Sequence, residues 1–253
     1  MEEELPLKQT LEREQRDAQE QTPEQHSCRP DTAEEDINER LAERLARCHS
    51  QSAGTELDLS NLALRDLPLE ALAQFPLLKK LNARGNQLTQ LPDEIARQLP
   101  HLTLLNAADN ALTALPDSIG ALRSLQRLLL ENNRLSRLPA ALSKLSALEE
   151  LNVRANQLEA LDDDLGDHLP KLTTLLLGGN ERLRSVPRSF GNLLALRTVD
   201  LTGNSALELV PDKIRRLHER HVILHSRAKR RELISRALRV RSVVAQSLSA
   251  SVL

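Results

Sequence analysis

Apolar residues recur along this chain with a spacing of 23 or 24 residues. The clearest copy is LLLENNRLSRLP at residues 128–139, with leucines at offsets 0, 2, 7 and 10, asparagine at offset 5 and proline at offset 11. A repeat of this length predicts a stack of one supersecondary unit rather than a domain with a single centre. The residues at offset 0 are Leu57, Leu81, Leu105, Leu128, Leu151, Leu175 and Val199.

A second apolar position, at offset 2, alternates with polar neighbours on either side. This alternation predicts a short, half-buried strand in every repeat. Between the strands, segments such as DEIARQL, DSIGALRSL and AALSKLSAL predict short helical pieces on the outer wall of the stack. The residues at offset 2 are Leu59, Ala83, Ala107, Leu130, Val153, Leu177 and Leu201.

Asparagine stands at offset 5 in six of the seven repeats, and Leu62 takes its place in the first. A buried amide bonds backbone groups that water cannot reach, so repetition at one offset predicts a structural ladder. Proline or, once, Asp162 then turns the chain away from the strand layer. The ladder residues are Asn86, Asn110, Asn133, Asn156, Asn180 and Asn204.

The chain before the repeats divides into two parts. Residues 1–30 are rich in Glu, Gln and Arg, and their composition predicts a disordered, acidic and polar tail. Residues 31–50 predict one amphipathic helix, with a capping box at Thr32 and Glu35 and apolar residues Ile37, Leu41 and Leu45 at helical spacing. We expect this helix to cover the apolar end of the first repeat.

These residues resemble the leucine-rich repeat family, LxxLxLxxNxLxxLPxxIxxL, over roughly residues 55–222. The period and the Leu-Pro pair are most similar to the intracellular 23–24-residue class of the Ras-suppressor, Scribble and plant Ras-group type. The resemblance implies an α/β repeat fold, a horseshoe-shaped solenoid with a parallel concave sheet, a helical convex side and helical caps. Residues 51–225 would form the repeat domain, and its concave face would bind a partner protein.

The exposed strand positions, at offsets -1, 1 and 3, are therefore the candidate binding site. Leu104, Leu129 and Leu176 are large apolar residues among charged ones, and an apolar centre with a charged rim is typical of a protein-binding patch. Isolated exposed leucines are also ordinary, and the absence of Tyr and Trp disfavours a very tight site. The candidate residues are Lys80, Asn82, Arg84, Leu104, Asn106, Arg127, Leu129, Glu131, Glu150, Asn152, Arg154, Thr174 and Leu176.

Composition narrows the function classes. The formal net charge of -2 gives the whole chain no general affinity for nucleic acid or acidic lipid. Both cysteines, Cys28 and Cys48, precede the repeats, and the N-terminus lacks the basic start and apolar core of a secretory signal. No apolar run is long enough to span a membrane. These features predict a soluble protein of a reducing compartment, cytoplasmic or alternatively nuclear.

The C-terminal residues 226–253 predict a basic helix and tail that follow HVILHS, an edge strand or a turn. This helix either caps the stack, binds an anionic surface, or serves as a nuclear address. The last residues, Ser251, Val252 and Leu253, resemble a ligand for PDZ domains. The basic residues are Arg227, Lys229, Arg230, Arg231, Arg236, Arg239 and Arg241.

No catalytic or cofactor motif is present, whether GxSxG, a phosphate-binding glycine loop, HExxH or CxxC. His218, His221 and His225 would share a helix face, but the intervening residues favour an extended chain, so no metal is expected. The sequence therefore predicts a non-enzymatic adaptor or scaffold that acts in signalling and binds no cofactor. The alternatives are a membrane- or nucleic-acid-associated protein led by the basic helix, and a bacterial effector acting on a host protein.

Overall fold

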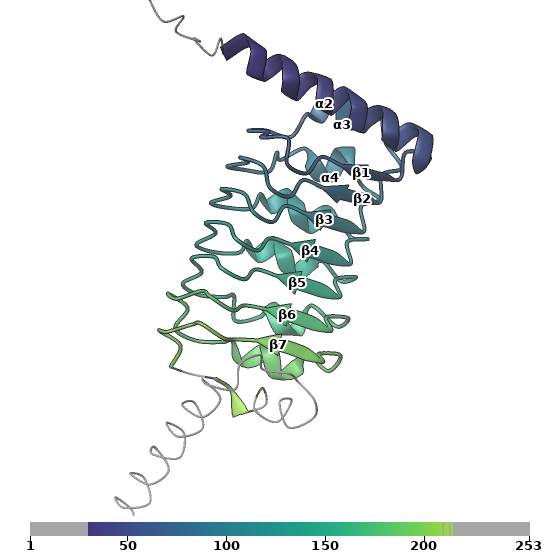
Figure 1. Cartoon of the computed structure of the whole chain (residues 1–253). Helices are drawn as coiled ribbons and strands as arrows, with labels where there is room; N and C mark the ends of the chain where they lie inside the picture. The colour runs from purple at the N-terminus through teal and green to yellow at the C-terminus, as the bar shows by residue number, and fades with distance from the viewer. Residues whose placement is uncertain (1–29, 209, 213, 215–253) are drawn as a thin grey trace, which may run out of the picture. The chain divides into compact units, whose positions relative to one another are not determined.

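A computed structural model describes residues 30–208, 210–212 and 214 (Figure 1). The chain divides into two compact units at Asn38 and Glu39, and all of the repeats lie in the second. The division falls within helix α2 (Pro30–Gln51), which extends one residue beyond each end of the segment predicted to be helical. Its role as a cap stays a prediction.

The predicted repeat fold is confirmed. Seven three-residue strands form one parallel sheet whose spatial order is the chain order, so each strand pairs with those of the neighbouring repeats. The offset-0 residues are direct partners, as Leu105 and Leu128 are. The strands are β1 (Glu56–Asp58), β2 (Lys80–Asn82), β3 (Leu104–Asn106), β4 (Arg127–Leu129), β5 (Glu150–Asn152), β6 (Thr174–Leu176) and β7 (Thr198–Asp200).

Six short helices return the chain between strands, and in the view of Figure 1 they stack behind the sheet. Pro116, Pro139 and Pro187 stand immediately before three of the four 3₁₀ helices, where their fixed φ suits the turn away from the strand layer. Each helix completes little more than one turn because only about 20 residues separate successive strands. They are α3 (Leu69–Leu72), α4 (Ile95–Gln98), η1 (Asp117–Ala121), η2 (Ala140–Lys144), η3 (Leu165–Asp167) and η4 (Arg188–Asn192).

The core lies between the sheet and these helices as a series of leucine layers. Leu105, Leu128 and Leu151 have no exposed surface, and the leucines and alanines at offset 2 are likewise buried. The two phenylalanines, Phe75 and Phe190, pack in the core of the first and the sixth repeat. Removing a buried leucine side chain from such a layer costs about 2–5 kcal/mol.

The offset-5 asparagines bond the backbones of adjacent repeats. Asn133 donates its amide to the carbonyls of Ala107 and Leu130 at 2.9 and 3.0 Å, and accepts from the N–H of Leu112 at 2.9 Å. Asn86 and Asn156 make the same pattern. These bonds satisfy carbonyl and N–H groups at the point where the chain leaves the sheet.

The residue at offset 4, immediately before the ladder position, has a left-handed backbone conformation in all seven repeats. The chain turns there from the strand toward the asparagine. Glycine, asparagine and aspartate tolerate this conformation best, and only Ala155 departs from that choice. The seven residues are Asn61, Gly85, Asp109, Asn132, Ala155, Gly179 and Gly203, with φ between 50° and 77°.

Candidate functional site

The strand face, which we define as the solvent side of β1–β7, carries three rows of side chains. Strand register aligns the offset -1 residues into a first row and the offset 1 residues into a second, while the offset 3 residues that follow the strands form a third. All thirteen candidate residues lie in these rows. The face is therefore continuous across the seven repeats, although which of its residues bind a partner stays a prediction.

Two of the three candidate leucines are neighbours. Leu104 pairs with Arg127 and Leu129 pairs with Asn106, so Leu104 and Leu129 lie diagonally across β3 and β4. Both are half-buried. Leu176 lies two strands from Leu129 in the second row, with Asn152 between them. Leu104 and Leu129, which we call the leucine pair, therefore lie on adjacent strands, whereas a whole strand separates Leu129 from Leu176.

Ion pairs flank Leu104 in the first row. Lys80 Nζ lies 2.6 Å from Glu56 Oε1 on one side of Leu104, and Arg127 Nε lies 2.7 Å from Glu150 Oε2 on the other. The two cationic side chains are about half exposed, so each pair contributes at most about 1 kcal/mol to stability. Their main consequence is that both cations point away from Leu104.

The asparagines of the second row have a local structural role. The side-chain oxygens of Asn82, Asn106 and Asn152 each accept a hydrogen bond from the backbone N–H two residues later, at 3.3, 3.1 and 3.2 Å. These bonds fix the chain as it leaves the strand. Leu129 and Leu176 occupy the same row and cannot accept such a bond. Their repeats therefore lack it and present an apolar side chain instead.

The third row carries a connected polar network. Arg84 Nε lies 2.6 Å from Asp109 Oδ2, and Asp109 also accepts the amide of Asn132 at 2.6 Å. Glu131 accepts the amide of Asn152 at 2.6 Å and lies 4.0 Å from Arg84 Nη1. Asp109 and Asn132 stand at offset 4, outside the candidate rows, although the recurrence of Gly, Asn or Asp at that offset is visible in the sequence.

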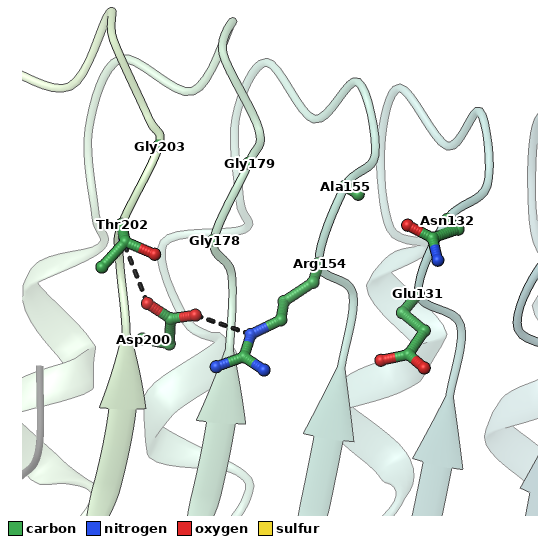
Figure 2. Close-up of a pocket in the computed structure, with 9 residues that line it drawn as sticks. All are labelled: Glu131, Asn132, Arg154, Ala155, Gly178, Gly179, Asp200, Thr202 and Gly203. Atoms are coloured by element: carbon green, nitrogen blue, oxygen red, sulfur yellow. Dashed lines mark hydrogen bonds and ion pairs between the residues drawn. The ribbon is translucent and has the colours of Figure 1, made fainter. Parts of the chain in front are cut away.

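A hollow of about 520 Å³ opens where the strands β4–β7 end (Figure 2). Arg154 reaches past Gly178 and places its Nε 2.6 Å from Asp200 Oδ2. This ion pair joins the repeats of β5 and β7 across the repeat of β6. A Cβ on Gly178 would lie 2.6 Å from that carboxylate oxygen, so a larger residue would displace the ion pair. The lining residues are Glu131, Asn132, Arg154, Ala155, Gly178, Gly179, Asp200, Thr202 and Gly203.

Asp200 stands at offset 1 of the last strand and is not among the thirteen candidate residues. Its side chain is 3% exposed, and its second oxygen accepts the N–H of Thr202 at 2.9 Å. Arg154 and Asp200 are 46 residues apart, so only the repeat register brings them to one place. Gly178, in a row that otherwise carries side chains, was the available hint.

At the other end of the strand face, the part of α2 from Glu39 onward contacts the first repeat. Arg44 Nη1 lies 2.9 Å from Asp58 Oδ2, and Arg40 donates to the carbonyl of Asn61 at 3.0 Å. Burial alone would raise the pKa of Asp58, but hydrogen bonds from Ser60 and the charge of Arg44 lower it below its ordinary value.

Cys48 does not form a catalytic pair with His49. Burial raises the pKa of the Cys48 thiol, which is 3% exposed, and a thiol is a poor nucleophile until it loses its proton. The imidazole of His49 instead lies against the ring of Phe75, with 4.5 Å between the ring centres. We assign Cys48 to packing.

The described residues contain neither a cluster of metal ligands nor a membrane-spanning helix. Among them, no three His, Cys, Asp or Glu side chains gather as a metal site, and no helix is both long and apolar enough to cross a membrane. The histidines His218, His221 and His225, the basic residues of the C-terminal segment and the PDZ-like end lie outside the described residues.

Parallel strands in register, a shared leucine core and an asparagine ladder define a repeat solenoid. Residues 55–178 match the family model of the leucine-rich repeat region, and the chain belongs to the leucine-rich repeat family. Domains of this family bind other proteins. The narrower 23–24-residue intracellular class stays a prediction.

Solved structures similar to this chain come from bacteria and plants. A leucine-rich repeat protein of Leptospira interrogans has a TM-score of 0.50 and 26% identity over 68% of this chain and 61% of its own. YopM from Yersinia enterocolitica has a TM-score of 0.52 and 31% identity over 68% and 34%. The plant peptide hormone receptor RGFR1, in complex with RGF2, has a TM-score of 0.54 and 27% identity over 63% and 26%.

The chain spans less than two thirds of the length of each of these proteins. No curated protein is significantly similar to it.

Proposed function

We propose that this protein is a non-catalytic adaptor that binds a partner protein on the strand face. The observation that carries the proposal is the leucine pair, Leu104 and Leu129, on a face built mainly of polar side chains, where Leu104 lies between two ion pairs. An apolar centre surrounded by polar groups supports protein binding. The similarity to RGFR1, solved in complex with RGF2, is consistent with a surface that accepts another polypeptide.

The charges of the strand face favour a protein partner over nucleic acid. Arg127 and Arg154 each have a carboxylate within 2.7 Å, and Lys80 is paired in the same way. Paired charges project little electric field, whereas nucleic-acid binding needs a net basic surface. Binding on this face would therefore depend on buried apolar area and respond weakly to salt.

The resemblance to intracellular repeat proteins supports a proposal for the cellular role. We propose that the adaptor acts in a cytoplasmic signalling assembly, in which one repeat domain holds a partner near other components. The sheet is wide enough for this, because seven strands at about 4.8 Å spacing present a face on the order of 30 Å across. A partner burying about 800 Å² on this side would fit it.

The test is capture of partners from a cell extract by the intact chain and by Leu129→Glu. A charge at Leu129 would prevent burial of the leucine pair while leaving the core intact, because the side chain points away from the Leu128 layer. We expect loss of the specific partner, with an unchanged melting temperature. Leu194→Glu is the matched control, since Leu194 is 89% exposed in the loop between η4 and β7.

A different result would move the site elsewhere. If Leu129→Glu captured the partner normally while removal of residues 226–253 abolished capture, the strand face would not be the binding surface. The basic C-terminal segment would then be the site, and binding would weaken steeply as the salt concentration rises.

A further inference from the structure

The hollow beside β4–β7 and the adjoining ends of β2 and β3 carry unequal numbers of opposite charges. The two cations are Arg84 and Arg154, and the three carboxylates are Asp109, Glu131 and Asp200. Each cation makes one short ion pair of 2.6 Å, Arg84 with Asp109 and Arg154 with Asp200. Among the described residues, the nearest cation to Glu131 is Arg84, at 4.0 Å. Within this set, Glu131 is therefore the carboxylate that has no cation closer than 4.0 Å.

Glu131 is held in position on the wall of the hollow. Its side chain is 28% exposed, and one carboxylate oxygen accepts the amide of Asn152 at 2.6 Å. Figure 2 shows Glu131 and Asn132 on one side of the hollow and the Arg154–Asp200 pair across it. Because Asn132 donates its amide nitrogen to Asp109, its oxygen is the polar atom that it can offer a ligand. Both residues thus present acceptors.

The floor of the hollow carries few side chains. Gly179 and Gly203 lie there with Ala155, which leaves backbone and one methyl group, while the Asp200 carboxylate covers Gly178. The volume of about 520 Å³ accommodates a long side chain. Lysine and arginine combine an apolar stem, which can lie along such a floor, with a charged end that donates hydrogen bonds.

We propose that the partner protein places a lysine or arginine side chain in this hollow, with its charged end on Glu131 and Asn132. This inference rests on the proposed function. It adds a preference for a basic partner residue on the same face, next to the leucine pair. An acidic side chain would meet the carboxylates of Glu131 and Asp200, and the Arg154 charge is already neutralised by Asp200. The partner segment therefore combines an apolar anchor with a basic residue.

The test is selection of a random peptide library displayed on phage against the intact chain, followed by affinity measurements on the synthesised peptides. We expect the selected peptides to share a lysine or arginine near an apolar residue. Glu131→Gln keeps an acceptor for Asn152 but removes the charge, and should weaken binding by about tenfold or more. The matched control is Glu149→Gln, an exposed carboxylate outside the hollow, which should bind normally.

A second measurement links the two groups. Replacing the basic residue of the peptide by norleucine should cost the same factor, and the two changes together should cost little more than either one. Melting curves of Glu131→Gln should match those of the unaltered protein, so that loss of binding is not loss of fold.

Several results would overturn the inference. Peptides with acidic residues that depend on Arg154 rather than Glu131, peptides without a basic residue, or no selected peptides would each do so. Peptides that lose affinity on Leu129→Glu but not on Glu131→Gln would refute the basic-residue site and support the proposed function. Peptides insensitive to both changes would contradict the two proposals together.

Discussion

Ala155 has a φ of 50°, a left-handed conformation that costs an L-residue other than glycine about 1–2 kcal/mol. The other six repeats place Gly, Asn or Asp at this offset. The recurrence was visible in the sequence, but a preference for small or polar residues does not reveal the sign of φ. By contrast, the buried offsets could be predicted because leucine at a fixed period has one physical explanation.

Ala155→Gly should therefore stabilise the protein, against the usual direction of an alanine-to-glycine change. Glycine relieves the left-handed strain, and this gain is larger than the cost of the greater conformational entropy that glycine gives the unfolded chain. The free energy of unfolding should rise by about 0.5–1 kcal/mol. Urea unfolding followed by circular dichroism would measure it. Ala160→Gly, at an exposed position without positive φ, should be slightly destabilising, and equal effects at the two sites would refute the strain argument.

At the scale of elements, sequence periodicity predicted the strands, the short helices and α2, but not how their side chains connect. The Arg154–Asp200 pair crosses an entire repeat, and the Arg84–Asp109 pair joins neighbouring repeats. Such contacts depend on register and on which side chains are long enough to reach. The candidate face could be located from the strand pattern. The ion pairs that leave Glu131 without a close cation could not be predicted, because they depend on the positions of side chains in three dimensions.

The contact of α2 with β1 predicts a pH dependence. The pKa of Asp58 is lower in the folded protein, so its contribution to stability is present above the unfolded-state pKa, near 4, and is lost as pH falls through the folded value. Asp58→Asn removes this contribution. The difference in unfolding free energy between the two proteins should shrink as pH is lowered from 6 to 3, and a constant difference would contradict the role given to the ion pair.

At the scale of the whole molecule, function depends on where a partner lies on the stack. The leucine pair and the hollow occupy the same side of the sheet, while the short helices cover its other side. In a solenoid of nearly identical repeats, each surface repeats the same backbone architecture along the stack. The side chains therefore decide where on that surface a partner binds. Loss-of-binding variants test this indirectly, whereas proximity tests it directly.

Photo-cross-linking of the captured partner is the most direct measurement of that proximity. One variant carries p-benzoylphenylalanine in place of Arg127, beside the leucine pair, and the other carries it in place of Lys144, an exposed residue of η2. We predict that the partner cross-links through position 127 and not through position 144. Cross-linking through position 144 alone would contradict binding on the strand face.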